Sequence, residues 1–189
     1  MIFILILSAL LIGSILTVLS STWSKIYASP TAEDVRYIRR TPDGGYILLA
    51  NNIHYRSGGA EDAWVIKLNS QGEIEWEKVF GTPMDDELLA VEPLTDGYIL
   101  AGYTKIDTNN WDAWILRLDK NGNIMWQKAF GFDDTYTYMD KAITIKAVGN
   151  EGYIIVGTTD AFDWNFREDI FVLKLNTSGN FELFFNLIR

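Results

Sequence analysis

The sequence predicts an all-β fold made of three copies of one four-stranded antiparallel unit, preceded by an apolar N-terminal helix. Two recurring motifs carry this prediction. The stretch DAWILRLDKNGNIMWQKAFG at residues 112–131 recurs at 62–81 and, in weaker form, at 169–188. An acidic residue with glycine, followed by a short apolar run, recurs at 42–50, 95–102 and 150–157. Sequence repeats of this length determine the architecture more directly than any other feature of a sequence.

Each unit begins with a strand, predicted at residues 34–40, 87–94 and 141–148. The acidic residue and glycine that follow mark a tight turn, and the GYILxx run behind them has the β-branched and aromatic residues of a second strand. Because this run does not alternate between apolar and polar residues, we expect both of its faces to be covered. The DAWxxxL and xIxWxKxF segments supply the third and fourth strands.

The residues that recur in register are expected to be structural. Gly72, Gly122 and Gly179 lie where a two-residue hairpin turn needs a positive φ angle. We expect the aspartates to bind backbone within their unit, and the tryptophans to lie in the core or at contacts between units: Asp62, Asp112 and Asp169, with Trp64, Trp76, Trp114 and Trp126. Recurrence in every unit is typical of packing, whereas an active site is expected once.

About 50 to 57 residues per unit is the length of a β-propeller blade. The blades are predicted at about residues 32–81, 82–131 and 132–189, within a domain that spans 22–189. Residues 23–27 match a fourth strand that has no first three strands before it. Since propellers close with about four to eight blades, three blades would leave an open arc with two apolar sides. A second copy or another protein could close it, or the chain is a propeller fragment without independent function.

These motifs resemble those of secreted archaeal and bacterial tandem-repeat proteins that carry DGGYIxAG and DAWxxKLDxxGNxxWEKxFG and have a quinoprotein-like β-propeller fold. The resemblance covers about residues 23–185. The segments 68–76 and 118–126 resemble the tryptophan-docking motif of quinoproteins, which implies that the Trp of one blade stacks near the glycine peptide of its neighbour. The third copy departs from the motif, because Leu183 stands where Trp is expected.

The N-terminal segment, residues 1–21, is predicted to be a membrane anchor or a signal peptide. Residues 2–19 form an uncharged apolar run of about eighteen residues, near the minimum for crossing a bilayer. No Lys or Arg precedes the run, which favours a retained anchor over cleavage near Ser21. A buried helix of the folded domain is the third alternative. The cations that follow the segment would favour a cytoplasmic location for the domain, but large domains often translocate regardless of flanking charge. We therefore expect the domain outside the cytoplasm, and secreted if the segment is cleaved.

The composition excludes several classes of function. The net charge of -9 opposes binding to nucleic acid phosphates and to anionic lipid headgroups. The absence of cysteine excludes disulfides, thiolate metal sites and a Cys nucleophile. With the single His54, a multi-histidine zinc site is excluded as well. We expect neither a cofactor nor a metal, because no loop has the spacing of a calcium site.

A binding site is expected on the long connections between units and between second and third strands. These connections differ from unit to unit and would share one face of a propeller. Their carboxylates and aromatic rings suit a glycan, a cation or a basic protein. The candidates are Asp85, Asp86, Asp107, Trp111, Asp133, Asp134, Tyr136, Asp163 and Trp164. Alternatively, the paired aspartates after each Phe-Gly only end a turn.

The sequence therefore predicts a membrane-anchored or secreted binding or assembly module without an identifiable catalytic site. The alternative is a carbohydrate-active enzyme of glycoside hydrolase type, whose loop carboxylates would lie about 5–10 Å apart.

Overall fold

The computed structural model describes residues 22–28, 33–53, 60–108, 110–132, 139–161 and 168–181. Within these ranges every regular element is a β-strand, as the repeat motifs predict. The apolar segment at residues 1–21 lies outside them, and so does the helix expected there. Among the described residues, no helix is long and apolar enough to cross a membrane.

The strands form three antiparallel sheets, one for each predicted unit, and strands that pair are consecutive in the chain. Sheet 1 contains β1 (Glu33–Arg40), β2 (Tyr46–Ile53), β3 (Glu61–Leu68) and β4 (Ile74–Phe80). Sheet 2 contains β5 (Asp86–Leu94), β6 (Gly97–Lys105), β7 (Trp111–Asp119) and β8 (Ile124–Phe130). Sheet 3 contains β9 (Lys141–Ala147), β10 (Tyr153–Thr159) and β11 (Asp169–Leu175).

Sheet 3 has three described strands where four are predicted. Phe181, which follows the last turn glycine, forms an isolated antiparallel bridge with Leu175 of β11. This bridge is the place where a fourth strand would begin. The rest of that segment, including Leu183, lies outside the described residues.

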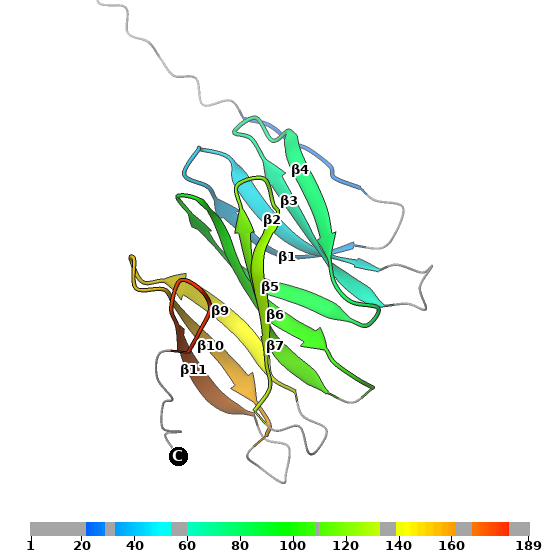
Figure 1. Ribbon diagram of the computed structural model, residues 1–189. Helices are drawn as coiled ribbons and strands as arrows, with labels where there is room; N and C mark the ends of the chain where they lie inside the picture. The colour runs from blue at the N-terminus through cyan, green and yellow to red at the C-terminus, as the bar shows by residue number, and fades with distance from the viewer. Residues whose placement is uncertain are drawn as a thin grey trace, which may run out of the picture.

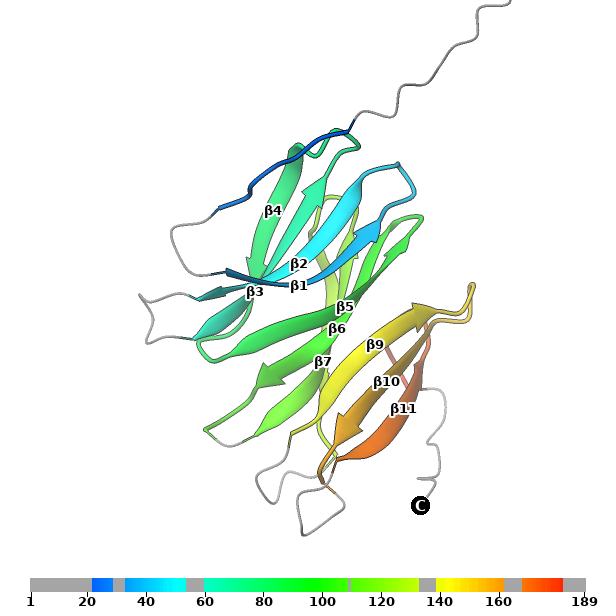
Figure 2. The ribbon, with the colours of Figure 1, turned by 180° about the vertical axis from the view of Figure 1, so that it is seen from behind.

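The sheets pack one after another in chain order (Figure 1). Their first strands, β1, β5 and β9, lie side by side, as Figure 2 shows from behind. Each pair of successive sheets encloses an apolar core. Between sheets 1 and 2 this core includes Ile47, Leu49 and Val65 on one side, and Leu100, Trp114 and Leu116 on the other. Between sheets 2 and 3 it includes Ala101 and Ile115, packed with Ile145, Ile155, Phe171 and Leu173.

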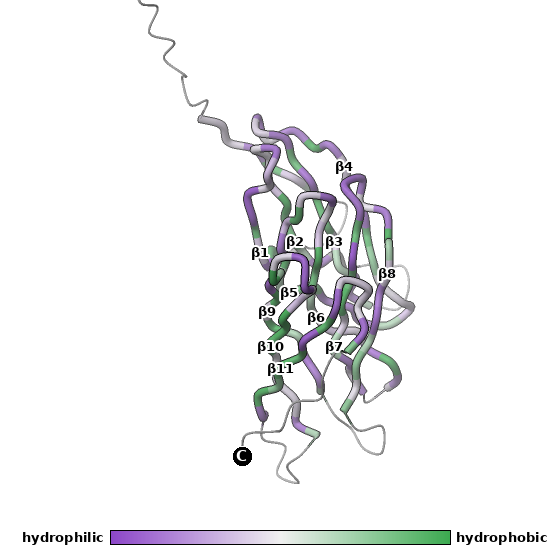
Figure 3. Tube along the Cα trace, turned by 60° about the vertical axis from the view of Figure 1, so that its left-hand side comes forward, coloured by the Kyte–Doolittle hydropathy of each residue, from purple (hydrophilic) through white to green (hydrophobic). Residues whose placement is uncertain are grey.

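Sheet 2 is covered on both faces, as its unbroken apolar run predicts, but the same expectation is wrong for sheet 3. The first six residues of β6 are all buried, whereas β10 of sheet 3 keeps every second residue buried and the residues between them partly or fully exposed. Hydrophilic residues gather at the turns that join the strands (Figure 3). A middle sheet thus has two buried faces, and sheet 3 has one.

The turns between third and fourth strands are longer than predicted. In sheet 1 the Asn69 N–H donates to the Glu73 carbonyl at 2.9 Å, so the loop comprises residues 70–72 rather than two residues. The Asn69 side chain closes the loop, because its Oδ1 accepts the N–H groups of Gln71 and Glu73, both at 2.9 Å. Asp119 and Asn176 make the same bonds in the other sheets. The predicted left-handed glycine is present, with φ angles of 73°, 73° and 74° at Gly72, Gly122 and Gly179.

A tryptophan joins each unit to the next, in a contact that we call the tryptophan dock. The indole Nε1–H donates to the carbonyl two residues before the turn glycine of the following sheet. The pairs are Trp23 and Ser70 at 3.1 Å, Trp76 and Lys120 at 3.0 Å, and Trp126 and Thr177 at 3.2 Å. Each ring lies so close to the glycine that an added Cβ would come within 2.7 to 2.9 Å of it.

Each docked ring also meets a tyrosine of the second strand of that sheet. The ring centres are 5.9 Å apart for Trp23 and Tyr46, 5.8 Å for Trp76 and Tyr98, and 6.0 Å for Trp126 and Tyr153. Edge-on contacts of this kind add to the energy of area burial. Residues 23–27, which have no unit of their own, therefore dock on sheet 1 as β4 docks on sheet 2.

A buried cation in the third strand holds the first turn of the same sheet. Lys67 is 2% exposed, and its Nζ lies 2.9 Å from the Asp43 carboxylate and 2.5 Å from the Glu75 carboxylate. Burial raises the pKa of Asp43, but hydrogen bonds from Thr41, Lys67 and the Gly45 N–H outweigh burial and bring this pKa down to about 2. Asp43 therefore keeps its charge at any physiological pH.

The same pairing recurs in the other two sheets. Arg117 pairs with Asp96 at 2.6 Å in sheet 2, and Lys174 pairs with Glu151 at 3.1 Å in sheet 3. The acidic residue of the turn motif is thus an ion-pair partner as well as a turn residue. The motif itself predicts only the turn, because the partner lies on a different strand.

Replacing Gly122 by Ala is expected to weaken the tryptophan dock. The new Cβ would lie 2.9 Å from the Trp76 ring, at a backbone φ of 73° that is strained for alanine. Gly149→Ala is the matched control, because its φ is 51° and nothing lies within 4 Å of the added atom. We expect the free energy of unfolding, measured in urea, to fall by about 1 kcal/mol for Gly149→Ala and about 2–4 kcal/mol for Gly122→Ala. Equal losses would mean that the ring contact contributes nothing.

Candidate functional site

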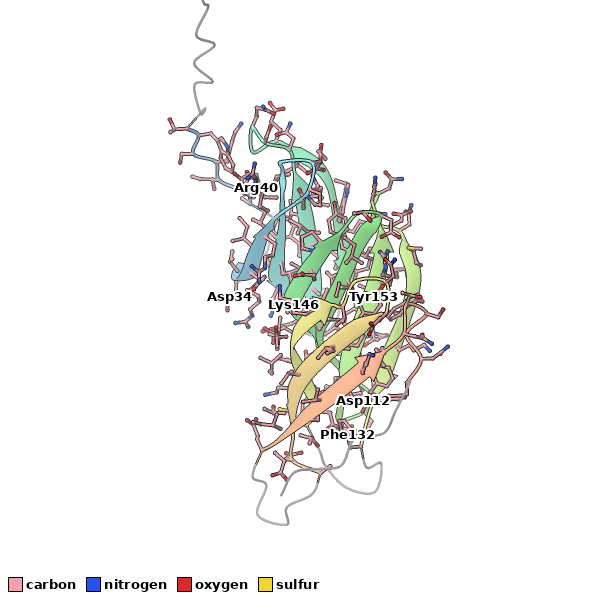
Figure 4. All side chains as sticks on the ribbon, turned by 90° about the vertical axis from the view of Figure 1, so that its left-hand side faces the viewer. Asp34, Arg40, Asp112, Phe132, Lys146 and Tyr153 are labelled. Carbon is pink, nitrogen blue, oxygen red and sulfur yellow. The ribbon has the colours of Figure 1, made fainter. Side chains whose placement is uncertain are left out.

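The binding site predicted from the sequence lies at the end of the stack that carries the long connections. We call this end the loop face, and Figure 4 marks it by Asp112 and Phe132. Five of the candidates lie outside the described residues: Asp133, Asp134, Tyr136, Asp163 and Trp164. The structure places the other four, which are Asp85, Asp86, Asp107 and Trp111.

Lys105 brings two of these candidates together. Its Nζ lies 3.4 Å from the Asp85 carboxylate and 4.8 Å from the centre of the Trp111 ring. Asp85 also accepts the N–H of Glu61 from sheet 1 at 3.2 Å. The carboxylate and the aromatic ring predicted to capture a cation are therefore already engaged by a cation of the protein itself.

Asp86 and Asp107 lie in different surroundings. Asp86 is 0% exposed, and its Oδ2 accepts the backbone N–H of Thr82 and the Thr82 hydroxyl, the latter at 2.9 Å. This is the arrangement of an aspartate that ends a turn. Asp107 is exposed on the connection after β6. The structure does not bring Asp86 and Asp107 into one site.

Asp140, a carboxylate of the connection that also carries the candidates Asp133 and Asp134, lies buried between sheets 2 and 3. Asp140 is 1% exposed and accepts the Phe132 N–H at 3.0 Å. Burial raises its pKa to about 6, against the hydrogen bonds of Thr159 and Phe132 that lower it, and the charges of Asp112 and Asp160 raise it further. Asp160 is held in turn by the Met139 N–H at 2.6 Å.

Asp140 occupies in sheet 3 the place of Asp86 in sheet 2. Asp86 is the first residue of β5, and Asp140 immediately precedes β9. Each accepts the N–H of the residue that follows Phe-Gly. A signal for this equivalence was present in the sequence, because both aspartates lie a short distance after that Phe-Gly pair. The differing loop lengths concealed it.

The recurring aspartates of the third strands pack against the glycine of Phe-Gly. An added Cβ at Gly131 would lie 2.8 Å from the Asp112 carboxylate, and one at Gly81 would clash with Asp62 and lie 2.9 Å from Asp86. Only glycine leaves room for these side chains. Asp169 is half-buried at the start of β11. The glycine recurs because a carboxylate approaches its backbone.

The described part of the loop face is therefore a structural network. Asp86 and Asp140 are at most 1% exposed and bind the backbone of their own turns. A glycoside hydrolase needs an acid and a base that both reach the substrate, so Asp86 and Asp140 are not suited to be that pair, whereas Asp85 and Asp107 are partly or fully exposed. Among the described residues, no three His, Cys, Asp or Glu side chains converge in a way that could hold a metal ion.

The opposite end of the stack carries the short turns, and we call it the turn face. An open hollow of about 520 Å³ lies there, where the ends of β1, β5 and β9 meet. Arg40 and Lys146 mark this end in Figure 4, away from Asp112 and Phe132. The side chains that shape the hollow come from all three sheets: Arg39, Arg40, Pro42, Glu92, Pro93 and Lys146.

No known family model matches this chain, and no curated protein is similar enough to match it. The assignment of a function therefore depends on the geometry of the sheets and of their two ends.

The raised pKa of Asp140 has a consequence for stability. Its pKa is about 6 in the folded protein against 3.8 ordinarily, so the folded protein holds this proton more tightly than the unfolded chain. The resulting stability is present at low pH and is lost as the pH rises through about 6. We expect Asp140→Asn, which is neutral and keeps an acceptor for the Phe132 N–H, to be more stable than the unmodified protein at pH 7, and nearly equal to it at pH 4.

Urea denaturation at the two pH values measures this difference. Glu168→Gln, at an exposed position of the loop face just before β11, is the control and is expected to change the stability equally little at both. A gain from Asp140→Asn that is as large at pH 4 as at pH 7 would contradict the assignment.

Proposed function

We propose that this chain is a non-catalytic assembly module with an incomplete β-propeller fold, anchored in a membrane by its N-terminal segment, and that a second copy of the chain covers its open side. The outer face of sheet 3 carries this proposal. Large apolar side chains lie exposed on it, at positions whose equivalents in sheet 2 are buried between sheets.

The strand register aligns each exposed residue of sheet 3 with a buried residue of sheet 2. Ile154, Ile170 and Val172 are 36%, 72% and 47% exposed. In sheet 2 the equivalent residues are Ile99, Ala113 and Ile115, and each is 0% exposed because sheet 3 packs on them. Sheet 3 thus presents the kind of face that receives another sheet, and no described residue receives it.

The other side of the stack differs. On the outer face of sheet 1, Trp64, Ile66 and Leu68 are at most 6% exposed, and Tyr27 from the docked segment 23–27 packs against them. An open arc would have two uncovered sides. Here residues 23–27 pack on one of them, so among the described sheets the outer face of sheet 3 is the side left open for a partner.

A second copy is the partner that this single face fits best. One self-complementary patch per molecule leads to a closed two-fold dimer, in which the same residues meet from both sides. The required contact is sheet on sheet, which the chain already makes twice internally. Covering each large aliphatic side chain would contribute about 1–2 kcal/mol. A ring of six blades would need the outer face of sheet 1 as well, and that face is occupied.

The apolar segment at residues 1–21 supports the membrane part of the proposal. It is uncharged and long enough to act as an anchor, with the sheets outside the cytoplasm. Anchored copies share one bilayer, which raises their effective concentration and favours a face-to-face contact that is weak in solution.

The full chain, kept in mild detergent, tests the proposal through its molar mass by light scattering after gel filtration. We expect the mass of two chains of 21.5 kDa each. Val172→Glu and Ile170→Glu should each give monomers, because a carboxylate cannot be buried unpaired in an apolar contact.

Met125→Glu is the control, since Met125 is 56% exposed on β8, away from this face. That variant should remain a dimer. A monomeric unmodified chain, or dimers that persist in Val172→Glu and Ile170→Glu, would overturn the proposal.

A further inference from the structure

The hollow at the turn face is open to solvent and has the volume of a small-molecule site. Its volume of about 520 Å³ falls in the range of about 300–1,000 Å³ that is usual for such sites. Pro42 and Pro93 form part of its wall, and their rings restrict backbone motion there. The first strands of all three sheets contribute to it, so the intact stack determines its shape.

Its charge is opposite to that of the protein. Arg39, Arg40 and Lys146 surround the hollow, with Glu92 as the opposing charge. The Lys146 Nζ lies 2.6 Å from the Glu92 carboxylate, so those two charges largely satisfy one another. The two arginines remain, in a chain whose net charge is -9. Concentration of positive charge at one concave place raises the local concentration of anions.

Within the described part of the chain, the two arginines have no counter-charge of their own. Neither Arg39 nor Arg40 forms an ion pair with another described residue, whereas Arg36 on the same strand pairs with Asp34 at 3.0 Å. The Nε of Arg39 is buried and has no hydrogen-bond acceptor among the described residues. Its guanidinium lies 5.1 Å from the centre of the Tyr37 ring, which holds the group in place. Because this Nε is buried, a ligand in the hollow would be bound by the terminal N–H groups of the two guanidiniums instead.

The backbone N–H groups of Thr41, Gly44 and Gly45 in the adjoining turn are already engaged within that turn. The Thr41 N–H donates to the Gly45 carbonyl at 2.9 Å, and the Gly44 N–H donates to the Thr41 carbonyl at 3.0 Å. The Thr41 hydroxyl donates to Asp43. Recognition of a ligand therefore falls to the guanidinium groups, whose planar arrangement of donors matches the paired oxygens of a carboxylate or a phosphate.

We infer that the hollow binds a small molecule that carries an oxyanion, phosphate or carboxylate, through Arg39 and Arg40. Lys146, held by Glu92, limits the space beside them. A long polyanion such as a nucleic acid strand is disfavoured by the negative charge of the rest of the protein, whereas a small anion meets mainly the local field. The site is made by one chain and does not depend on the proposed dimer.

Isothermal titration of the full chain in mild detergent, at constant ionic strength, tests this inference with two probes, inorganic phosphate and citrate. We expect saturable binding of at least one of them, with one ion per chain. Arg40→Gln should weaken it by about tenfold or more, the usual effect of losing a charged hydrogen bond. Arg40 is exposed, so this variant is expected to fold normally.

Two further variants test whether the hollow binds anions through specific contacts or only through the positive charge of the surface. Glu92→Gln removes the opposing charge and releases Lys146, so binding should become a few-fold tighter. Lys120→Gln removes the same charge from an exposed turn outside the hollow, and its affinity should stay within about twofold. Val172→Glu should bind like the unmodified chain, whether or not the dimer forms.

A preference for phosphate or for citrate supports the inference in either case and identifies the oxyanion. No saturable binding of either probe would overturn it. So would an equal loss of affinity in Arg40→Gln and Lys120→Gln, because the hollow would then contribute nothing beyond its charge.

Discussion

An indole ring lying on the glycine of the following sheet is the contact on which the stack of sheets depends. It joins units that share no strand, through one hydrogen bond and one ring face, across 44 to 51 residues of chain. Neither partner can change alone, because a larger residue at the glycine would displace the ring and a smaller residue at the tryptophan would leave the turn uncovered. The tyrosine beneath each ring completes the same contact. This mutual requirement explains why these positions recur while most surface positions do not.

Much of the fold could be predicted because it follows from local or periodic properties. Each sequence signal lies within a few residues of the structure that it determines: the acidic residue with glycine, the apolar run and the turn glycine. These signals therefore predict β2, β6 and β10 correctly. The pairing of Lys67 with Asp43 could not be found in this way, because the two residues meet only after the strands pair. The covered outer face of sheet 1 was missed for a similar reason, since it depends on where residues 23–27 dock.

The candidate site was predictable only in part. The expectation that variable loops carry function led to carboxylates such as Asp85 and Asp86, and in the described residues both serve the fold. Asp140 belongs to the same group. Burial and the charges of Asp112 and Asp160 raise its pKa, and the residues next to Asp140 in the sequence do not predict this shift. The hollow of the turn face could not be predicted at all. Arg39, Glu92 and Lys146 occupy the same register position in the first strands of the three units, opposite Ile47, Ile99 and Ile154, but the residue type differs in each unit, so the sequence shows no motif there.

The tryptophan docks all have the same direction along the chain. Trp23 reaches forward to Ser70, Trp76 to Lys120 and Trp126 to Thr177. A ribosome or a translocation channel delivers the residues in that order, so each finished sheet emerges with a tryptophan whose receiving turn does not yet exist. At about 5–20 residues per second, that ring would wait roughly 2 to 10 seconds for its partner. Each sheet would then act as the template on which the next one forms, and the stack would fold sequentially from its N-terminal end.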